Sequence, residues 1–250
     1  PNVVELEASY TLSSGNDGNL PLAATYKGRE TGLEKTGLET FADIEEISIV
    51  AAPGYSSDYR NNASIINQTT QHLISHCERM RYRIAVLDCP DNQLLSEVRD
   101  FRAQFDSKHA ALYYPWVTML DPLDPAGRRE IDLPPSGFVA GIYARNDVEH
   151  GVHKAPANEV VRGAIGFEIF LNKAQQDVLN PEGINCFRFF EGRGYRLWGA
   201  RTITSDPEWK YVNLRRYFAY LERSIEKGTQ WVVSQNNSEI PSKMAEIQAQ

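Results

Sequence analysis

The chain has 250 residues, of which 42% are hydrophobic and 24% charged, and its formal net charge is −7 at pH 7. This length and composition are typical of a globular protein with one large or two small domains, and they argue against a disordered or fibrous chain. The acidic balance and the scattered basic residues argue against a nucleic-acid partner, and no apolar run reaches the ~18 residues that a membrane span requires.

The first part of the chain changes character near residue 44. Residues 1–43 are rich in Gly, Ser, Thr and Asn, which predicts a lead-in of loops and short strands packed on the core. An apolar run at residues 44–52, ended by Pro-Gly, predicts a buried strand. Apolar residues between Ile65 and Met80 then recur at helical spacing and predict an amphipathic helix of about five turns.

Strand and helix alternate again in the next segment. Residues 82–87 predict a strand, Asp91 is the expected N-cap of a helix with an apolar stripe that reaches Phe105, and residues 109–117 predict a further strand. Such alternation over short links is typical of a parallel sheet with helices on its faces. The sequence therefore predicts an α/β fold with a parallel-sheet core flanked by helices.

The middle of the chain predicts a long loop and two helices. Residues 121–135 contain four prolines and predict a loop, after which Ser136 is the expected cap of a helix. That helix is apolar nearly all round over residues 138–144, so we expect it to be buried. Residues 166–171 predict a short ordered segment, and residues 172–180 predict a helix that stops before a proline.

The last third predicts a hairpin and a long helix. Residues 185–190 and 195–201 predict two aromatic strands around a glycine-containing turn. Apolar residues at helical spacing between Leu214 and Ile225 predict a helix closed by Gly228, followed by a strand at residues 231–233.

These elements divide the chain into three predicted parts. They are the lead-in at residues 1–43, a single α/β domain at residues 44–235, and a polar, frayed tail at residues 236–250.

The cysteines show no disulfide framework. They are odd in number, widely spaced, and lie in or beside apolar stretches at Cys77, Cys89 and Cys186. We therefore expect three buried free thiols.

No cofactor or metal site is predicted. The glycines at residues 192–199 are followed by a strand rather than by the helix that a dinucleotide fingerprint requires, and no P-loop occurs. His72 and His76 are spaced for one helix face, but the residue after His72 is Leu rather than the Glu of a zinc peptidase. His150 and His153 are expected to belong to a structural turn.

A serine hydrolase is the alternative interpretation, because parallel α/β sheets host many such enzymes. The Gly-x-Ser-x-Gly elbow is absent, and the first predicted strand ends in Ala-Ala-Pro-Gly rather than in an Asp. Ser136 is the serine that this alternative would use, although an N-cap role explains it more simply. We expect no catalytic residues.

Two blocks, residues 134–158 and 183–216, are dense in Gly, Pro, Asn and aromatic residues. Both resemble the tail sheath proteins of contractile phage tails and related contractile injection systems. The resemblance covers roughly residues 12–236. It rests on short runs in chain order: Gly-Asn-Asp-Gly at 15–18, Lys-Thr-Gly-Leu at 35–38, Tyr-Tyr-Pro-Trp at 113–116, Lys-Ala-Pro-Ala-Asn at 154–158, Leu-Asn-Pro at 179–181, Gly-Ile-Asn at 183–185, Trp-Gly-Ala-Arg-Thr at 198–202 and Lys-Tyr-Val-Asn at 210–213.

The resemblance implies a mechanical function and a core likened to subtilisin in topology but without its active site. Copies would assemble as stacked rings, usually hexameric, around an inner tube protein, with baseplate and terminator proteins as further partners and no cofactor. The expected location is the virion tail sheath or the particle of a related device, made in the bacterial host cytoplasm. The sixteen positions expected to carry the structural motif are Pro115, Trp116, Gly137, Arg145, Asp147, Gly151, Lys154, Pro156, Asn158, Asn185, Gly194, Trp198, Arg201, Tyr211, Asn213 and Arg216.

The resemblance weakens at both ends of the sequence. The chain starts at Pro1 without a methionine and stops soon after residue 237, where family members continue into linking arms and a C-terminal domain. We therefore expect a core fragment that is monomeric on its own.

Overall fold

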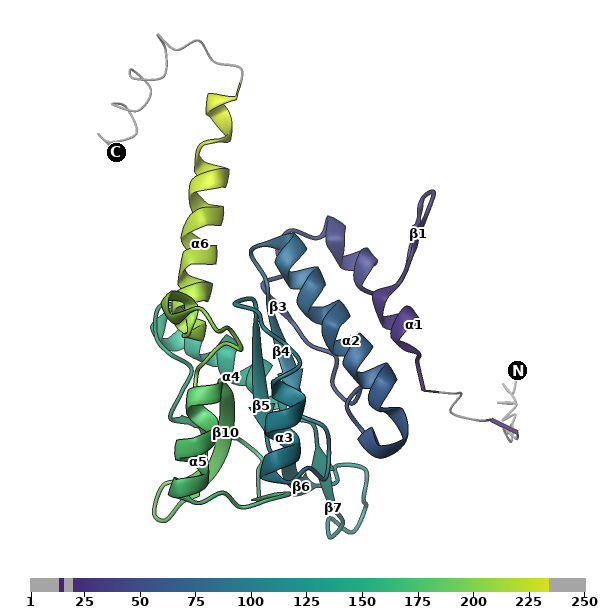
Figure 1. Ribbon diagram of the computed structural model, residues 1–250, viewed down its shortest axis with the longest axis vertical. Coiled ribbons are helices and arrows are strands. Elements are labelled where there is room, and N and C mark those ends of the chain that lie inside the picture. Colours follow the sequence, from purple (N-terminus) through teal and green to yellow (C-terminus); the bar gives the residue numbers. More distant parts are fainter. Residues whose placement is uncertain (1–13, 16–19, 234–250) are drawn as a thin grey trace, which may run out of the picture.

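The computed structural model describes residues 14–15 and 20–233, which form an α/β protein built on a six-stranded sheet (Figure 1). The order of the strands is β3-β4-β5-β10-β11-β8. Helices cover both faces of this sheet, and each face has its own layer of buried apolar side chains. The predicted α/β class is confirmed.

Neighbouring strands run parallel on one side of the sheet and antiparallel on the other. The parallel strands are β3 (Ile49–Val50), β4 (Ile84–Asp88), β5 (Ala110–Tyr114) and β10 (Ile184–Phe190). β10 turns back into β11 (Gly194–Trp198), and β8 (Glu159–Val160) pairs with the far side of β11. All residues of β4 and β5 are buried, because a strand with both faces covered carries a continuous apolar run.

One face of the sheet is covered by α2 (Tyr59–Met80), α3 (Leu95–Arg102) and α5 (Lys173–Leu179). The apolar stripe of α2, which includes Ile66 and Leu73, packs on alternate strand residues. α2 forms where the apolar spacing predicted a helix, since a stripe at every third or fourth residue can be buried only against the sheet.

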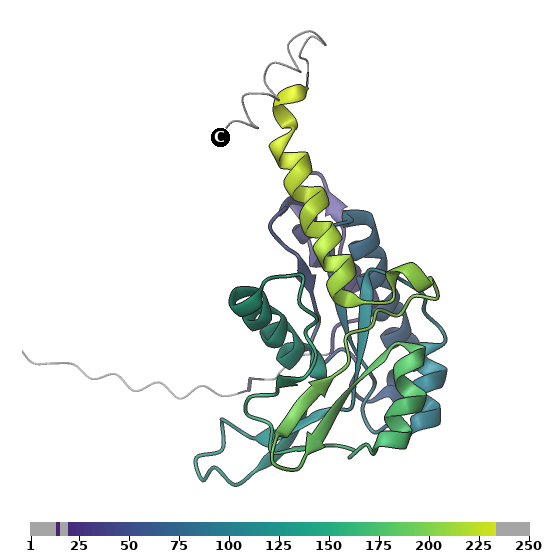
Figure 2. The same ribbon diagram turned by 90° about the vertical axis from the view of Figure 1, so that its left-hand side faces the viewer.

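The opposite face is covered by α4 (Pro135–His150) and by the first turns of α6 (Val212–Gly228). Figure 2 shows α4 on the other side of the sheet from α3 and α5. The expectation that this helix is buried all round is wrong, because Val139, Ile142 and Tyr143 face the sheet whereas Gly137 and Gly141 are exposed. Glycine has no side chain to bury, so those positions add little hydrophobic free energy.

A second, three-stranded sheet has the order β7-β6-β9, with β6 (Val117–Leu120), β7 (Glu130–Leu133) and β9 (Gly166–Phe167). Two predictions are wrong here. The single strand expected at residues 109–117 is two strands in two sheets, and β5 ends before Pro115, which has no N–H to continue the hydrogen-bond ladder. The expected loop at residues 121–135 contains β7, which pairs with β6.

The lead-in contains more helix than its turn-rich sequence predicts. Its elements are α1 (Ala23–Lys27), β1 (Glu30–Thr31), β2 (Glu34–Lys35) and the 3-10 helix η1 (Gly37–Asp43). Within the strand predicted at residues 44–52, only the two residues of β3 form a strand. Residues 16–18 of the Gly-Asn-Asp-Gly run and the predicted tail lie outside the described residues.

Two predicted helix caps are wrong. The helix expected to start at Asp91 begins at Leu95, and Glu97 accepts a hydrogen bond from the backbone N–H of Leu94. Asp91 instead accepts one from the N–H of Tyr59, the first residue of α2. Ser136 lies inside the first turn of α4, behind Pro134 and Pro135.

The three remaining elements are 3-10 helices, η2 (Asn180–Glu182), η3 (Pro207–Trp209) and η4 (Gln230–Val232). The strand expected at residues 231–233 is wrong, since η4 occupies that position. The helix predicted to begin at residue 172 forms as α5, with Asn172 as its N-cap, and the hairpin of β10 and β11, the long final helix and the three buried free cysteines are confirmed.

A buried amide joins the sheet to the segment that follows the hairpin. The side chain of Asn185 on β10 donates to the carbonyl oxygens of Leu112 at 3.1 Å and Arg201 at 2.7 Å, and accepts from the N–H of Arg201 at 2.6 Å. A Cβ on Gly199 would lie 2.9 Å from its Oδ1. This close approach explains a glycine at position 199.

Replacing Asn185 by Ala should lower the free energy of unfolding by about 3 kcal/mol, because the buried groups of Leu112 and Arg201 lose their partner. Urea denaturation followed by circular dichroism measures this change. The matched control is Asn213→Ala, which removes a single bond to the His153 carbonyl and should cost about 1 kcal/mol. Equal losses in the two variants would contradict this role of Asn185.

Candidate functional site

The first block folds into the exit of α4 and the connection that follows it to β8. The structure gathers six of the predicted motif residues around this connection, and they come from α4, from the connection itself and from α6. They are Arg145, Asp147, Lys154, Asn158, Asn213 and Arg216. The block thus carries contacts between elements rather than a set of reactive groups.

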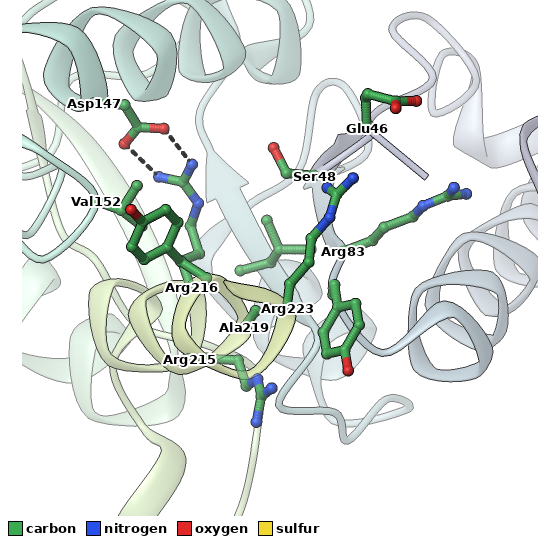
Figure 3. A pocket seen from close by; sticks show the side chains of 12 residues that line it. Glu46, Ser48, Arg83, Asp147, Val152, Arg215, Arg216, Ala219 and Arg223 are labelled. Carbon is green, nitrogen blue, oxygen red and sulfur yellow. Dashed lines mark hydrogen bonds and ion pairs between the residues drawn. The ribbon is translucent and has the colours of Figure 1, made fainter. Parts of the chain in front are cut away.

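Asp147 and Arg216 join α4 to α6. Two guanidinium nitrogens of Arg216 donate to the two carboxylate oxygens at 2.9 and 2.5 Å, as Figure 3 shows. The side chain of Arg216 is only 6% exposed and that of Asp147 is 23% exposed. The guanidinium also lies over the ring of Tyr143, at 4.7 Å from the centroid. A bidentate pair stacked on an aromatic ring fixes the angle between the two helices.

Glu159 on β8 is the centre of a second ionic group. It forms ion pairs with Arg145 at 3.4 Å and with Lys154, whose ammonium also donates to Asn146 at 2.9 Å. Burial alone would raise the pKa of Glu159, but the contacts with Lys154 and Arg145 outweigh it and hold the pKa below its ordinary value. The group ties the end of α4 to the edge strand.

Backbone conformation explains two further motif positions in the connection. Gly151 ends α4 with a φ of +91°, a conformation that side chains disfavour. Asn158 has a φ of +61°, and its N–H donates to the Leu197 carbonyl at 2.7 Å. Asn213 of α6 donates to the His153 carbonyl at 3.0 Å. These contacts set the path of the chain from α4 to the sheet edge.

Pro115 and Trp116 lie away from this region, at the switch between the two sheets. The indole N–H of Trp116 donates to the Cys89 carbonyl at 2.8 Å, and the hydroxyl of Ser56 donates to the same oxygen at 3.3 Å. Trp116 therefore anchors the new strand direction to the end of β4.

The remaining motif positions have separate environments. Pro156 is buried, Gly194 has a φ of +73° in the hairpin, and the rings of Trp198 and Phe190 lie 4.6 Å apart. The backbone of Arg201 forms an isolated antiparallel β-bridge with that of Tyr211, and its guanidinium lies 5.6 Å from the centroid of the Tyr211 ring. A Cβ on Gly137 would meet nothing within 4 Å, so the structure does not explain a glycine there.

Ser136 has a partner that the sequence interpretation missed. Its hydroxyl and its N–H donate to the carboxylate of Asp88, at 2.7 and 2.5 Å, and both residues are fully buried. No histidine is hydrogen-bonded to Ser136 among the described residues. A nucleophilic serine needs a base and access for its substrate, so this setting argues against the hydrolase alternative. Asp88 directly follows the strand predicted at residues 82–87, but no sequence pattern linked it to Ser136.

The histidines do not form a metal cluster. His76 is buried and contacts Arg83 at 2.6 Å, and burial and then Arg83 lower its pKa to about 4. His72 on the same helix is half-buried. Within the described ranges, no group of three or more His, Cys, Asp or Glu residues is arranged to hold a metal ion.

A cavity of about 210 Å³ lies between α6 and the beginnings of β3 and β4 (Figure 3). Arg216 in its wall is paired with Asp147, and Arg215 is paired with Glu222 at 3.2 Å. Arg83 donates to three backbone carbonyls. These groups are already used within the chain, so the cavity has the character of a packing gap beside α6.

Comparison with known proteins decides the family. Residues 35–203 match the family model of the phage tail sheath protein central domain. This chain belongs to the tail sheath family. The family resemblance of the two sequence blocks is thereby confirmed.

Curated sheath relatives are similar over most of this chain. A putative prophage major tail sheath protein of Pseudomonas aeruginosa is 28% identical over 222 residues, covering 84% of this chain and 54% of the relative. The tail sheath protein of Escherichia phage P2 is 24% identical over 242 residues, which cover 88% of this chain and 56% of the relative. The chain therefore spans about half the length of these sheath relatives.

Solved sheath structures share the fold. The helical sheath of the anti-feeding prophage in its contracted state is 32% identical with a TM-score of 0.64, covering 80% of this chain and 52% of that one. The contracted sheath complex of the extracellular contractile injection system PVC is 27% identical, with a TM-score of 0.66. The match covers 81% of this chain and 54% of that one. No helix in the described part of this sheath chain is long and apolar enough to cross a membrane.

Breaking the pair between α4 and α6 should destabilise this sheath chain. Arg216→Met leaves Asp147 partly buried without a counter-ion, so we expect a loss of about 3 kcal/mol in the free energy of unfolding. A double-mutant cycle with Asp147→Asn should give a coupling energy of about 2 kcal/mol. The control, Asp43→Asn, breaks the exposed pair with Lys35 and should cost less than about 1 kcal/mol. Additive losses in the cycle would contradict direct pairing.

The unfolding free energy should also depend on the titration of Asp88. Burial raises the pKa of Asp88 to about 7, although the hydrogen bonds from Ser136 act to lower it. Between about pH 4 and about pH 7 the folded chain keeps a proton that the unfolded chain has lost. Stability should therefore fall as the pH rises through this range, by at most about 1.4 kcal/mol per pH unit, and level off above it.

Asp88→Asn tests this dependence, because the amide keeps partners for Ser136 but does not titrate. Urea denaturation of both proteins at about pH 4, 6 and 8 gives the difference in their unfolding free energies. The variant should gain stability relative to the native chain as the pH rises. A difference that stays constant with pH would exclude this titration.

Proposed function

We propose that this chain is the central part of a structural subunit of a contractile sheath. Copies of the subunit polymerise as stacked rings, hexameric in the family that the sequence resembles, around an inner tube. The sheath shortens and widens and drives the tube through a target envelope. The observation that carries this proposal is the match of residues 35–203 to the central domain of tail sheath proteins.

The proposed partners are other copies of the subunit, the inner tube protein, and the baseplate and terminator proteins at the sheath ends. Similar solved structures support association with other copies and with a baseplate, since they are a helical sheath and a baseplate of the anti-feeding prophage. The proposed location is the tail sheath of a virion or the particle of a related contractile device, with synthesis in the host cytoplasm.

The core acts in this proposal as a rigid unit without catalysis. Work comes from the difference in free energy between two packings of the subunits, a rigid-body rearrangement, rather than from nucleotide hydrolysis. A sheet buried on both faces and the largely buried ion pair that joins α4 to α6 favour rigidity. We further propose that the core is related to subtilisin in topology and has no active site, which agrees with a buried Ser136 bonded to Asp88.

The motif positions are structural in this proposal. Most of them hold the connections among α4, β8, β11 and α6, and Pro115, Trp116 and Asn185 act at the parallel strands. The domain at residues 44–235 thereby moves as one body, with the lead-in at residues 1–43 packed on it.

The full-length protein, expressed with its tube partner, should form tubular polymers visible by negative-stain electron microscopy, in the absence of nucleotide. The control is the tube protein alone, which distinguishes sheathed from naked tubes by their outer diameter. Assemblies that require ATP, or a well-folded protein that gives no sheath-like polymer under any salt condition, would contradict the proposed function.

A further inference from the structure

The long final helix α6 carries an apolar stripe that points away from the core. Its large aliphatic and aromatic side chains recur at spacings of four, three and four residues, at Leu214, Phe218, Leu221 and Ile225. Such spacing places side chains in one line along a helix. These four residues are called the α6 stripe below. Phe218 is 41% and Ile225 is 63% exposed, whereas the two leucines are half-buried.

The opposite side of α6 holds the helix to the core. Arg216 and Ala219 are buried there, and Arg216 pairs with Asp147 of α4. Further along the helix, Glu226 accepts a hydrogen bond from the hydroxyl of Tyr82 at 2.5 Å. α6 therefore turns a largely polar side to the core and its apolar stripe outward, which is the reverse of the arrangement expected for a helix that packs on a single core.

The beginning of the α6 stripe is partly covered within the chain, but its end is open. The ring centroid of Trp209 in η3 lies 5.2 Å from that of Phe218. The last turns of α6, which carry Ile225, extend past the strands of the six-stranded sheet (Figures 1 and 2). Apolar surface contributes stabilising free energy only when another surface removes it from water, so an open stripe of this kind marks an interaction site.

Sheath relatives extend well beyond the part that aligns with this chain. The aligned region is 54% of the prophage sheath protein of Pseudomonas aeruginosa and 56% of the sheath protein of phage P2. The match to the central domain ends at residue 203, before α6 begins at Val212. α6 is thus anchored on the central domain but lies outside it, and the unaligned part of a sheath subunit is large enough to supply a second core.

A second copy and the inner tube fit the α6 stripe less well. Two copies that paired through the same stripe would form an isologous contact, which closes as a dimer, whereas stacked rings need contacts that repeat. A contact with the tube would have to break, because the proposed sheath widens as it contracts. A continuous apolar seam is typical of permanent association instead.

We propose that an apolar surface from the remaining part of the same subunit packs along the α6 stripe. α6 then belongs to two cores, since its polar side is anchored on the central domain and its stripe is buried in the second core. This inference goes beyond the proposed function, because it concerns a contact inside one subunit and does not require polymerisation.

Thiol labelling tests the contact, because the three native cysteines are buried. Ile225→Cys should react with a maleimide in the 250-residue chain nearly as fast as a free thiol. In the full-length subunit, kept below the concentration at which it polymerises, the rate should be at least about a hundredfold lower. Lys227→Cys is the matched control. It lies two residues away, on the other side of the helix, and its rate should differ by less than about threefold between the two proteins.

Thermal unfolding gives a second measurement that needs no reactive thiol. Ile225→Ala should lower the melting temperature of the full-length subunit by about 5 °C, because it leaves a cavity in the second core. The same change in the 250-residue chain should lower the melting temperature by less than about 1 °C, since the side chain is exposed there. Equal shifts in the two proteins would overturn the inference.

The labelling outcomes also identify a different partner of the α6 stripe. Protection of Ile225→Cys in the 250-residue chain itself would overturn the inference, because residues 234–250 or a second copy would then cover the stripe. Protection that appears only in the polymer would overturn it in favour of a neighbouring copy or the tube. Equal protection of Lys227→Cys would overturn the stripe as the contact. A subunit that never polymerises contradicts the proposed function alone, since the labelling is measured on the monomer.

Discussion

The burial of the central strands on both faces is the constraint on which the rest of the structure depends. Every side chain of β4 and β5 is buried, so each face must be covered along its full length. The helices α2, α3 and α5 cover one face, and α4 and the start of α6 cover the other. Burial of apolar surface supplies most of the stabilising free energy, but it also removes water from the polar groups at the strand ends.

The polar contacts of the core satisfy these groups, and they lie where elements meet. Asn185 bonds the segment after the hairpin to the sheet, and Asp88 bonds the start of α4 to the end of β4. Asp147 and Arg216 join the two helices of the second face. Such contacts are directional, so they specify one arrangement of the helices on a sheet that apolar packing alone would hold less uniquely. This uniqueness is what a subunit that moves as a rigid body requires.

Sequence reasoning recovered the elements whose signal is local. The apolar spacing of α2, the continuous run of β4 and the aromatic hairpin are all visible in short windows of sequence. The runs shared with sheath proteins also sufficed to identify the family. The extent of burial of α4 was mispredicted because the apolar run at residues 138–144 included Gly141, which buries no side chain.

The errors elsewhere arose where distant residues decide the outcome. Asp91 was expected to cap the helix that follows it, but its carboxylate accepts a hydrogen bond from the first residue of α2. Ser136 was expected to cap α4, but its hydroxyl donates to Asp88, which lies 48 positions earlier in the sequence. The expected strand at residues 109–117 is divided between two sheets, whose other strands come from separate parts of the chain. The hairpin register places Arg188 directly opposite Arg196, so two like charges lie side by side. No local pattern encodes these pairings, so only the folded chain reveals them.

The central claim is that this core is a rigid body within a contractile polymer. Cryo-electron microscopy of the full-length sheath before and after contraction tests it most directly. The account predicts that the sheet, α4 and the first turns of α6 superpose between the two states within about 1 Å, with the pair of Asp147 and Arg216 intact in both. Separation of α4 from α6, or a rearranged sheet in one state, would contradict it.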